Sequence, residues 1–297
     1  MKLKSVLIVF GTRPEAIKMA PLVEALSSDF DVKVCVTAQH RRMLDQVLEL
    51  FRIKPDFDLD LMKSNQDLFS LTSDLLVNLK SVYKEVNPDL VLVHGDTTTS
   101  MSVALAAFYS KIMIGHVEAG LRTYNLDSPY PEEANRQLIS KLASFHFTPT
   151  SRSKQNLLAE GIKEEKIATT GNTVIDAILS IEKESTLVKY PEHVIKKIPF
   201  LSDEAEQRKY ILVTGHRREN FGKGFKEICK ALKEIAMNNP EIEIIYPAHL
   251  NPNVQQPVKE YLSNLINVHL IDPLSYVHFV KLMKGCYLIL TDSGGIQ

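Results

Sequence analysis

The chain has 297 residues, which is enough to bury a large core and to form two domains. Its formal net charge is −1, and charges of both signs are interspersed, so it lacks the long basic field that binds nucleic acid or an anionic membrane. No apolar run approaches the roughly 18 residues of a membrane span. The cysteines Cys35, Cys229 and Cys286 lie far apart, without a C-x-x-C pair, which favours a reducing, cytoplasmic location. We expect no nucleic-acid partner and no membrane partner.

The first part of the chain alternates apolar strands with helices. Predicted strands cover residues 5–10, 32–37, 90–93, 112–117, 145–148 and 167–170, and predicted helices cover residues 15–26, 41–51, 68–86, 100–109, 131–144 and 173–181. The strands are apolar throughout rather than alternating, which is typical of a parallel sheet with helices on both faces. Thr12 and Glu15 have the spacing of a capping box at the start of the first helix.

A second alternating set follows a less regular segment. Residues 183–208 are charged, contain two prolines and predict a passage between domains. Beyond them, predicted strands cover residues 210–214, 242–246, 268–271 and 287–290, with helices at 225–237, 254–265 and 276–283. We therefore predict an α/β fold of two domains, residues 1–182 and 183–297. A buried strand and a glycine turn at 287–295 should open a helix, so we expect the second domain to be incomplete.

Three acidic residues stand where neighbouring elements begin or end. Asp96 and Glu118 follow consecutive predicted strands, and Glu132 lies behind Pro131 in the first turn of a helix. Carboxyl ends of neighbouring parallel strands face one crevice, so we expect these acids to gather around a ligand. Two acids can perform general acid and base work when their pKa values are pushed apart. We predict that these three residues form the chemical centre.

Two loops have the character of phosphate sites. In the first, residues 11–18 join a strand to a helix amino terminus, where free N–H groups favour an anion and Arg13 can hold a phosphate. A capped helix with solvated charges explains that loop equally well. In the second, residues 292–295 include two glycines that let the backbone approach a phosphate, although an ordinary glycine turn is the simpler interpretation of this loop alone. His216, in a third loop, could supply a proton or charge to a leaving phosphate, or belong to an ordinary polar loop.

Several site classes lack their signatures. The sequence contains no G-x-G-x-x-G fingerprint, which argues against a nicotinamide cofactor on this architecture. It contains no H-x-H or H-E-x-x-H spacing for a metal, and no G-x-S-x-G elbow for a nucleophilic serine. We predict no cofactor and no metal.

Eight segments together resemble one known family. They are FGTRPEAIKMAP (10–21), HGDTTT (94–99), HVEAGLRT (116–123), PEEANR (131–136), GNTVID (171–176), TGHRRE (214–219), HLNPNV (249–254) and DSGGIQ (292–297). In this set the chain resembles the bacterial non-hydrolysing UDP-N-acetylglucosamine 2-epimerases, with a carboxyl-terminal truncation. The resemblance implies two Rossmann-like domains facing a cleft, a GT-B type fold, with a UDP-sugar bound between them. It also implies a homodimer.

The implied reaction interconverts UDP-N-acetylglucosamine and UDP-N-acetylmannosamine by eliminating and re-adding UDP through 2-acetamidoglucal. The product would supply N-acetylmannosamine-derived sugars for cell-surface polysaccharide. The residues that match the family's catalytic positions are Asp96, Glu118, Glu132 and His216. The first three would move protons at C2, and His216 would assist the departing UDP oxygen. The residues that match its UDP-binding positions are Arg13, Lys18, Phe279, Ser293, Gly294 and Gly295, with Phe279 beside the uracil.

Two departures from the family pattern carry consequences. Leu274 stands where the family usually has a glutamine near the uracil. The family also continues after Gln297 with two glutamates and, further on, an arginine that contact the nucleotide. A molecule that ended at Gln297 should therefore bind UDP weakly and turn over slowly. The sequence leaves open a hydrolysing relative, a glycosyltransferase on the same fold and an inactive UDP-binding remnant.

Overall fold

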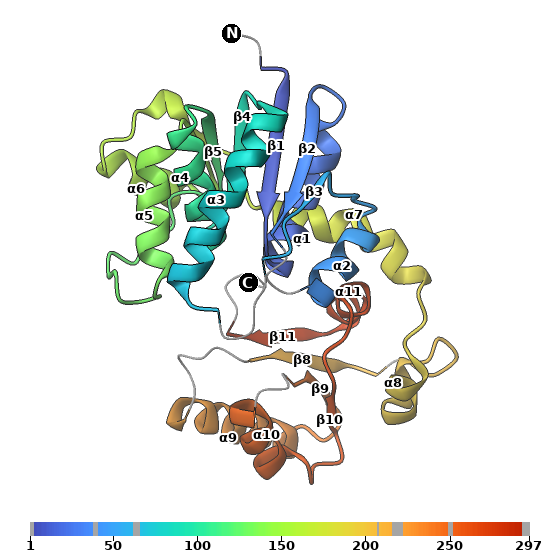
Figure 1. Cartoon of the computed structure of the whole chain (residues 1–297). Coiled ribbons are helices and arrows are strands. Elements are labelled where there is room, and N and C mark those ends of the chain that lie inside the picture. The colour runs from blue at the N-terminus through green and yellow to red at the C-terminus, as the bar shows by residue number, and fades with distance from the viewer. Residues whose placement is uncertain are drawn as a thin grey trace. The chain divides into compact units, whose positions relative to one another are not determined.

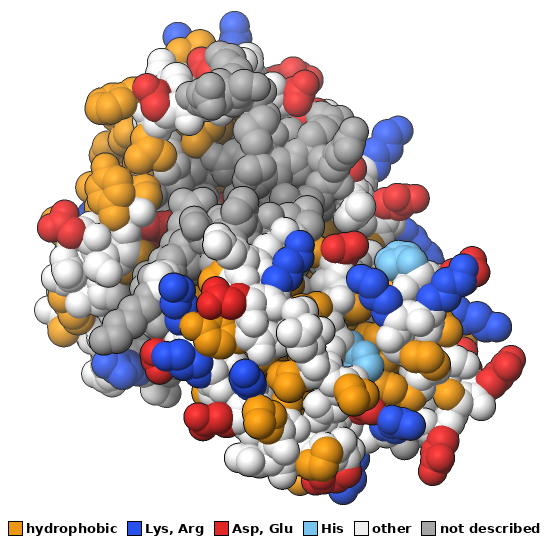
Figure 2. Space-filling model, turned by 90° about the horizontal axis from the view of Figure 1, so that it is seen from below, with side chains coloured by type: hydrophobic (Ala, Val, Ile, Leu, Met, Phe, Trp, Pro, Cys, Tyr) orange, Lys and Arg blue, Asp and Glu red, His pale blue; other side chains and the backbone are white. Residues whose placement is uncertain are grey.

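The computed structural model describes residues 3–37, 41–61, 66–206, 208–215, 222–248 and 252–292. The chain forms two compact units, Met1–Ala177 and Ile178–Gln297, and each has a sheet of its own. The division falls inside helix α7 (Thr173–Leu187), which begins in the first unit and ends in the second. In the described part of the chain, no helix combines the length and apolar character needed to cross a membrane. On the face drawn in Figure 2, basic and acidic side chains are interspersed.

The first unit is built on a seven-stranded parallel sheet (Figure 1). Its strands are β1 (Ser5–Phe10), β2 (Asp31–Val36), β3 (Phe57–Asp58), β4 (Leu90–His94), β5 (Met113–Val117), β6 (Phe145–Thr148) and β7 (Ile167–Thr169). They lie in the order β3-β2-β1-β4-β5-β6-β7. Strands are added on one side of β1 up to β3 and then on its other side from β4. The boundary between β1 and β4 is therefore a topological switch point, the place where open α/β sheets bind ligands.

Helices cover both faces of this sheet. They are α1 (Arg13–Leu26), α2 (Arg41–Leu50), α3 (Leu68–Val86), α4 (Thr98–Tyr109), α5 (Glu132–Leu142) and α6 (Ser151–Ala159), with a 3-10 turn at Glu164–Lys166. Leu75 of α3, Val103 of α4 and Ile139 of α5 join Leu7 of β1 in one buried cluster. Figure 1 shows α1 and α2 on the opposite side of the sheet. Burial on both faces explains why the strands read as continuous apolar runs.

The second unit repeats the arrangement with four parallel strands. These are β8 (Tyr210–Thr214), β9 (Glu243–Pro247), β10 (Val268–Ile271) and β11 (Leu288–Thr291), in the order β10-β9-β8-β11. The accompanying helices are α8 (Glu192–Lys197), α9 (Lys223–Asn238), α10 (Pro252–Leu262) and α11 (Tyr276–Gly285), with a 3-10 turn at Pro199–Leu201. The parallel α/β fold predicted from the strand pattern is confirmed in both units.

The segment predicted as a passage between domains is more ordered than its composition indicates. Tyr190, Val194 and Phe200 are buried in the same cluster as Leu212 of β8. The ammonium of Lys281, on α11, lies 4.9 Å from the centre of the Tyr190 ring. The high charge of this segment hides a short apolar face that packs on the second sheet.

Two elements of the first unit were missed from the sequence, β3 and α6. Strand β3 has only two residues, too few for any alternation to show. Helix α6 reads SRSKQNLLA, and only two of its residues, Ser153 and Leu157, are buried. The Thr150 side chain accepts a hydrogen bond from Ser153 N and caps it. A nine-residue polar helix of this kind is fixed by its cap and its tertiary contacts rather than by periodicity.

Gly120 anchors α6 close to the backbone that follows β5. Its φ is +85°, and a Cβ placed there would lie 2.3 Å from the carbonyl oxygen of Ser153. The Asn156 side chain also donates to the Gly120 carbonyl oxygen at 2.9 Å. The backbone of α6 can approach this closely only because residue 120 has no side chain.

We therefore expect Gly120→Ala to lower the free energy of unfolding by about 3 kcal/mol, combining a left-handed backbone with a backbone clash. Gly161→Ala is the matched control, because Gly161 has φ +81° but no atom within 4 Å of its Cβ position. Gly161→Ala should lower the free energy of unfolding only by the cost of the left-handed backbone, about 1 kcal/mol. Urea unfolding of both variants measures the difference, and equal losses would contradict the role of the α6 contact.

Candidate active site

The predicted acids gather at the carboxyl edge of the first sheet, beside its switch point. Asp96 follows β4 and Glu118 follows β5, and these two strands are neighbours. Two hydrogen bonds with residues of β5 hold Gly95, which links the end of β4 to Asp96. Gly95 N donates to the carbonyl oxygen of Val117 at 2.9 Å, and His116 Nε2 donates to the carbonyl oxygen of Gly95 at 2.7 Å. Burial lowers the pKa of His116 to about 3, so this ring is neutral and its proton lies on Nε2.

Glu118 is held by three polar groups that converge on one of its oxygens. Oε2 accepts from the Lys18 ammonium at 2.5 Å and from the Asn172 amide at 2.9 Å. His94 Nε2 lies 3.7 Å from the same oxygen. The backbone of Glu118 has φ +62°, a left-handed conformation that costs a non-glycine residue on the order of 1 kcal/mol. The fold keeps this strained residue in place by contacts from three other elements.

These partners favour the ionised form of Glu118. Burial by itself would raise the pKa of Glu118, but the charges of His94 and Lys18 and the hydrogen bonds from Lys18 and Asn172 lower it overall. Burial lowers the pKa of His94, although the neighbouring Glu118 acts in the opposite direction. Glu118 is therefore a carboxylate in the resting protein.

Asp96 has the opposite electrostatic character. Burial raises its pKa to about 6, and the charges of Glu118, Glu132 and Glu15 act in the same direction, opposed by Arg136. The Arg136 guanidinium contacts Asp96 Oδ2 at 2.9 Å. The side chain of Asn135 donates to the backbone carbonyl of Asp96 at 2.9 Å, so α5 fixes both the backbone and the carboxylate of this residue. A pKa near 6 lets Asp96 exchange a proton close to neutral pH.

Two adjacent glutamates of α5 have different surroundings. Glu132, in the first turn, is half-buried, and its charge is one of those that raise the pKa of Asp96. Glu133 is fully buried and accepts from the backbone N–H groups of Thr123 and Tyr124 at 3.0 and 3.1 Å. Through these hydrogen bonds Glu133 stabilises the loop before α5. Glu132 is therefore the acid of this pair that is available to the site.

Glu15 joins the two loops at the switch point, a role that its capping-box spacing only partly predicts. One oxygen accepts from Gly11 N at 3.0 Å and Thr12 N at 2.8 Å, and the capping box is confirmed. The other oxygen accepts from the hydroxyls of Thr97 at 2.6 Å and Ser100 at 3.0 Å. A single buried carboxylate thus ties the loop after β1 to the start of α4, directly beside Asp96.

The predicted phosphate ligands of the first unit lie on α1. Arg13 is its first residue and is half-buried. Lys18 lies one turn further along, and its ammonium pairs with Glu118. The family resemblance implies a phosphate contact at Lys18, and the structure pairs its ammonium with Glu118.

The remaining predicted site residues belong to the second unit. Phe279 is half-buried on α11 and, like Leu274, packs against the buried cluster that includes Ile245. His216, Ser293, Gly294 and Gly295 lie outside the described residues.

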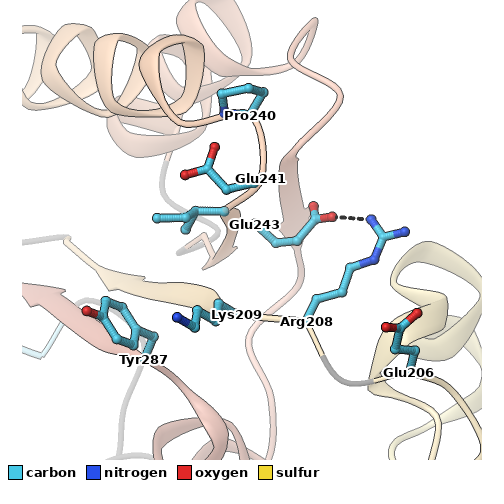
Figure 3. Close-up of a pocket in the computed structure, with 8 residues that line it drawn as sticks. Glu206, Arg208, Lys209, Pro240, Glu241, Glu243 and Tyr287 are labelled. Atoms are coloured by element: carbon cyan, nitrogen blue, oxygen red, sulfur yellow. Dashed lines mark hydrogen bonds and ion pairs between the residues drawn. The ribbon is translucent and has the colours of Figure 1, made fainter.

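The second unit contains a pocket of about 430 Å³ (Figure 3). It is formed at the amino ends of β8, β9 and β11, whereas α/β sheets bind ligands at the carboxyl ends. Both of its basic side chains already have partners within the pocket. Arg208 contacts Glu243 at 2.6 Å, and the Lys209 ammonium lies 5.2 Å from the centre of the Tyr287 ring. We assign no ligand to it.

Residues 24–297 match the family model described as UDP-N-acetylglucosamine 2-epimerase. The chain belongs to this epimerase family. It is 58% identical to the UDP-N-acetylglucosamine 2-epimerase of Campylobacter jejuni over 297 residues, which is 99% of this chain and 78% of that protein. It is 57% identical to the Escherichia coli K12 enzyme of the same name, over 98% of this chain and 78% of that protein.

Solved structures of the epimerase family share the fold. The Neisseria meningitidis enzyme bound to UDP-GlcNAc superposes with a TM-score of 0.89 at 52% identity, covering 98% of this chain and 78% of that one. The Staphylococcus aureus MnaA structure with UDP gives a TM-score of 0.84 at 44% identity, covering 99% of this chain and 76% of that one. The predicted GT-B type fold with two Rossmann-like units is confirmed by these neighbours.

Proposed function

We propose that this member of the epimerase family interconverts UDP-N-acetylglucosamine and UDP-N-acetylmannosamine by eliminating and re-adding UDP. The observation that carries the proposal is the pair of acids at neighbouring strand ends. Glu118 has a lowered pKa, and the pKa of Asp96 is raised to about 6. Paired acids whose environments separate their pKa values are suited to opposite roles in proton transfer. Inversion at C2 needs one group to take a proton and another to return one.

The chemistry proceeds in two balanced steps. A carboxylate removes the C2 proton, the C–H electrons form the C1–C2 double bond, and the C1–O bond breaks so that UDP leaves as an anion with that electron pair. The product is 2-acetamidoglucal. In the second step the UDP oxygen bonds to C1 again while an acid protonates C2 on its other face. The net change is inversion at C2, with no oxidant or reductant consumed.

The roles follow from the electrostatics of each group. Glu118, ionised at rest, is the group suited to accept a proton, and Asp96, with its higher pKa, is suited to donate one; in the reverse reaction they exchange roles. Glu132 supports Asp96 by keeping that pKa high. We place Arg13 and Lys18 on the phosphate side of the substrate. By the family motifs, His216 assists the departing UDP oxygen.

The family resemblance also implies nucleotide contacts in the second unit. Ser293, Gly294 and Gly295 would hold the UDP phosphates, and Phe279 would line the uracil pocket. Phe279→Ala should therefore weaken binding of uridine, which isothermal titration with uridine and UDP measures.

Proton NMR of UDP-N-acetylglucosamine incubated with the protein in deuterated water tests the reaction. Deuterium at C2 together with formation of UDP-N-acetylmannosamine is the expected result, because C2 loses its proton to the enzyme. Free N-acetylmannosamine with UDP release would indicate the hydrolysing reaction instead. Absence of any exchange at C2 would overturn the proposal.

We also propose that the protein acts in the cytoplasm as a homodimer and that its product supplies cell-surface polysaccharide. All three cysteines are unpaired, which fits a reducing compartment. Exposed apolar side chains on the packed helices α3 and α4, among them Val77, Phe108 and Tyr109, offer an apolar surface to a second copy. Light scattering coupled to size-exclusion chromatography should give twice the chain mass. Nucleotide-activated sugars are the donor form from which polysaccharides are built.

A further inference from the structure

Asn172, just before helix α7, makes two hydrogen bonds with its side chain. Nδ2 donates to Glu118 Oε2 at 2.9 Å, and Oδ1 accepts from the backbone N–H of Val174 at 3.1 Å. The second bond fixes the amide orientation, because only the oxygen can accept from an N–H. The nitrogen therefore faces the carboxylate and donates to it.

The contacts of Glu118 are all on one side of its carboxylate. Lys18 from α1, His94 from β4 and Asn172 all approach Oε2. Among the described residues none donates to Oε1. This oxygen lies on the side of Gly95, where an added Cβ would be 3.8 Å from it, next to Asp96 in the chain. Three groups thus approach one oxygen, while the other, beside Gly95, has no donor among the described residues.

We propose that Asn172 is a positioning residue for the reaction: it orients Glu118 so that Oε1 faces the reacting carbon, and it helps to keep the carboxylate ionised. Asn172 acts through Glu118, so this inference rests on the role of Glu118 in the proposed function. The same hydrogen bond links Glu118 to the start of α7, the helix through which the chain passes from the first unit into the second.

A purely structural role would not require an amide at this position. Capping the first turn of α7 uses only an acceptor, and Asp, Ser or Thr would serve equally well. The donor half of the side chain is needed only for the contact with Glu118. Asn172→Asp therefore separates the two roles, because it keeps the acceptor for Val174 and replaces the donor with a second negative charge.

In Asn172→Asp we expect kcat to fall by about 100-fold, with KM for the UDP-sugar changed by no more than about twofold. The thermal midpoint should stay within a few degrees of the wild-type value, because the cap is kept. Asn172→Leu removes the donor without adding charge, and its kcat should be lower than that of the wild type by about tenfold or more. Asn78→Asp is the matched control, since the Asn78 amide donates only to the carbonyl of Asp74 within α3, and it should keep wild-type kcat.

A direct titration gives a readout that does not depend on turnover. NMR of protein labelled with ¹³C at glutamate carboxyls follows the pKa of Glu118, with Glu118→Gln identifying its signal. Asn172→Leu should raise that pKa by about one unit or more, because a hydrogen bond to the charged form is lost. The titratable groups that contact Glu118, Lys18 and His94, remain in place in each variant.

Failure of the Asn172 inference and failure of the proposed function would give different results. A variant Asn172→Asp that turns over like wild type and leaves the Glu118 titration unchanged would overturn the inference. A wild-type protein that fails to exchange C2 hydrogen would overturn the proposed function instead, while the titration would still report whether Asn172 holds Glu118 ionised.

Discussion

Asp96→Asn should lower kcat for epimerisation by about 10³-fold while leaving the affinity for UDP within about twofold. Asparagine keeps the shape of the side chain and an oxygen that can accept from Arg136, but it cannot carry a proton. The Asp96 pKa of about 6 suits proton exchange near neutral pH, and the amide has no such equilibrium. Steady-state rates of UDP-N-acetylmannosamine formation measure kcat, and calorimetric titration with UDP measures the affinity.

Asp89→Asn is the matched control for this variant. Asp89 lies at the opposite end of the same strand, directly before β4, where its carboxylate accepts from Lys4 N at 2.8 Å and Ser5 N at 3.1 Å. It removes the same charge from the same strand but should keep kcat near wild type. Retained formation of UDP-N-acetylmannosamine in Asp96→Asn, or an equal loss in Asp89→Asn, would remove Asp96 from the chemistry.

The convergence of Asp96 and Glu118 was predictable from the sequence because it follows from a general property of parallel sheets. Continuous apolar runs that each end at a polar residue place those residues at one edge, whatever the details of packing. The helix boundaries of α3 and the capping box at Thr12 were predictable for a similar reason. Each depends on residues within one or two turns of each other.

The partners of these acids were not predictable in the same way. Lys18 and Glu118 are 100 residues apart, and Asn172 and Glu118 are 54 residues apart, so their contacts depend on how α1 and α7 begin relative to β5. No local pattern encodes that geometry. The opposite pKa shifts were not predictable either, because burial raises the pKa of Asp96 whereas those partners lower the pKa of Glu118. The buried face of the segment before β8 was not predictable, because Val194 and Phe200, which pack in the second unit, are surrounded in the sequence by charged residues.

Arg136→Met should both destabilise the fold and raise the pKa of Asp96. The Arg136 guanidinium contacts Asp96 at 2.9 Å and Glu133 at 3.5 Å, and its removal leaves two carboxylates without their cation. We expect a loss of about 3 kcal/mol in the free energy of unfolding at pH 8. Arg136 opposes the burial that raises the Asp96 pKa to about 6, so this pKa should rise further in the variant. The limb of the kcat–pH profile that reports Asp96 should move to higher pH by about one unit.

The raised pKa of Asp96 makes the stability of the folded protein depend on pH. Because the pKa of Asp96 is raised by folding, the folded protein holds its proton to higher pH than the unfolded chain, and stability falls as pH rises through this range. In Arg136→Met the range extends upward, so the stability deficit should be larger at pH 8 than at pH 5, which urea unfolding at the two pH values measures. Arg122→Met is the matched control: the Arg122 side chain is fully buried and pairs with Glu160 at 2.6 Å, and its charge is not among those that act on the pKa of Asp96. It should destabilise the protein without moving the Asp96 limb, and a limb that moves equally in both variants would show that lost stability, rather than a lost charge beside Asp96, causes the shift.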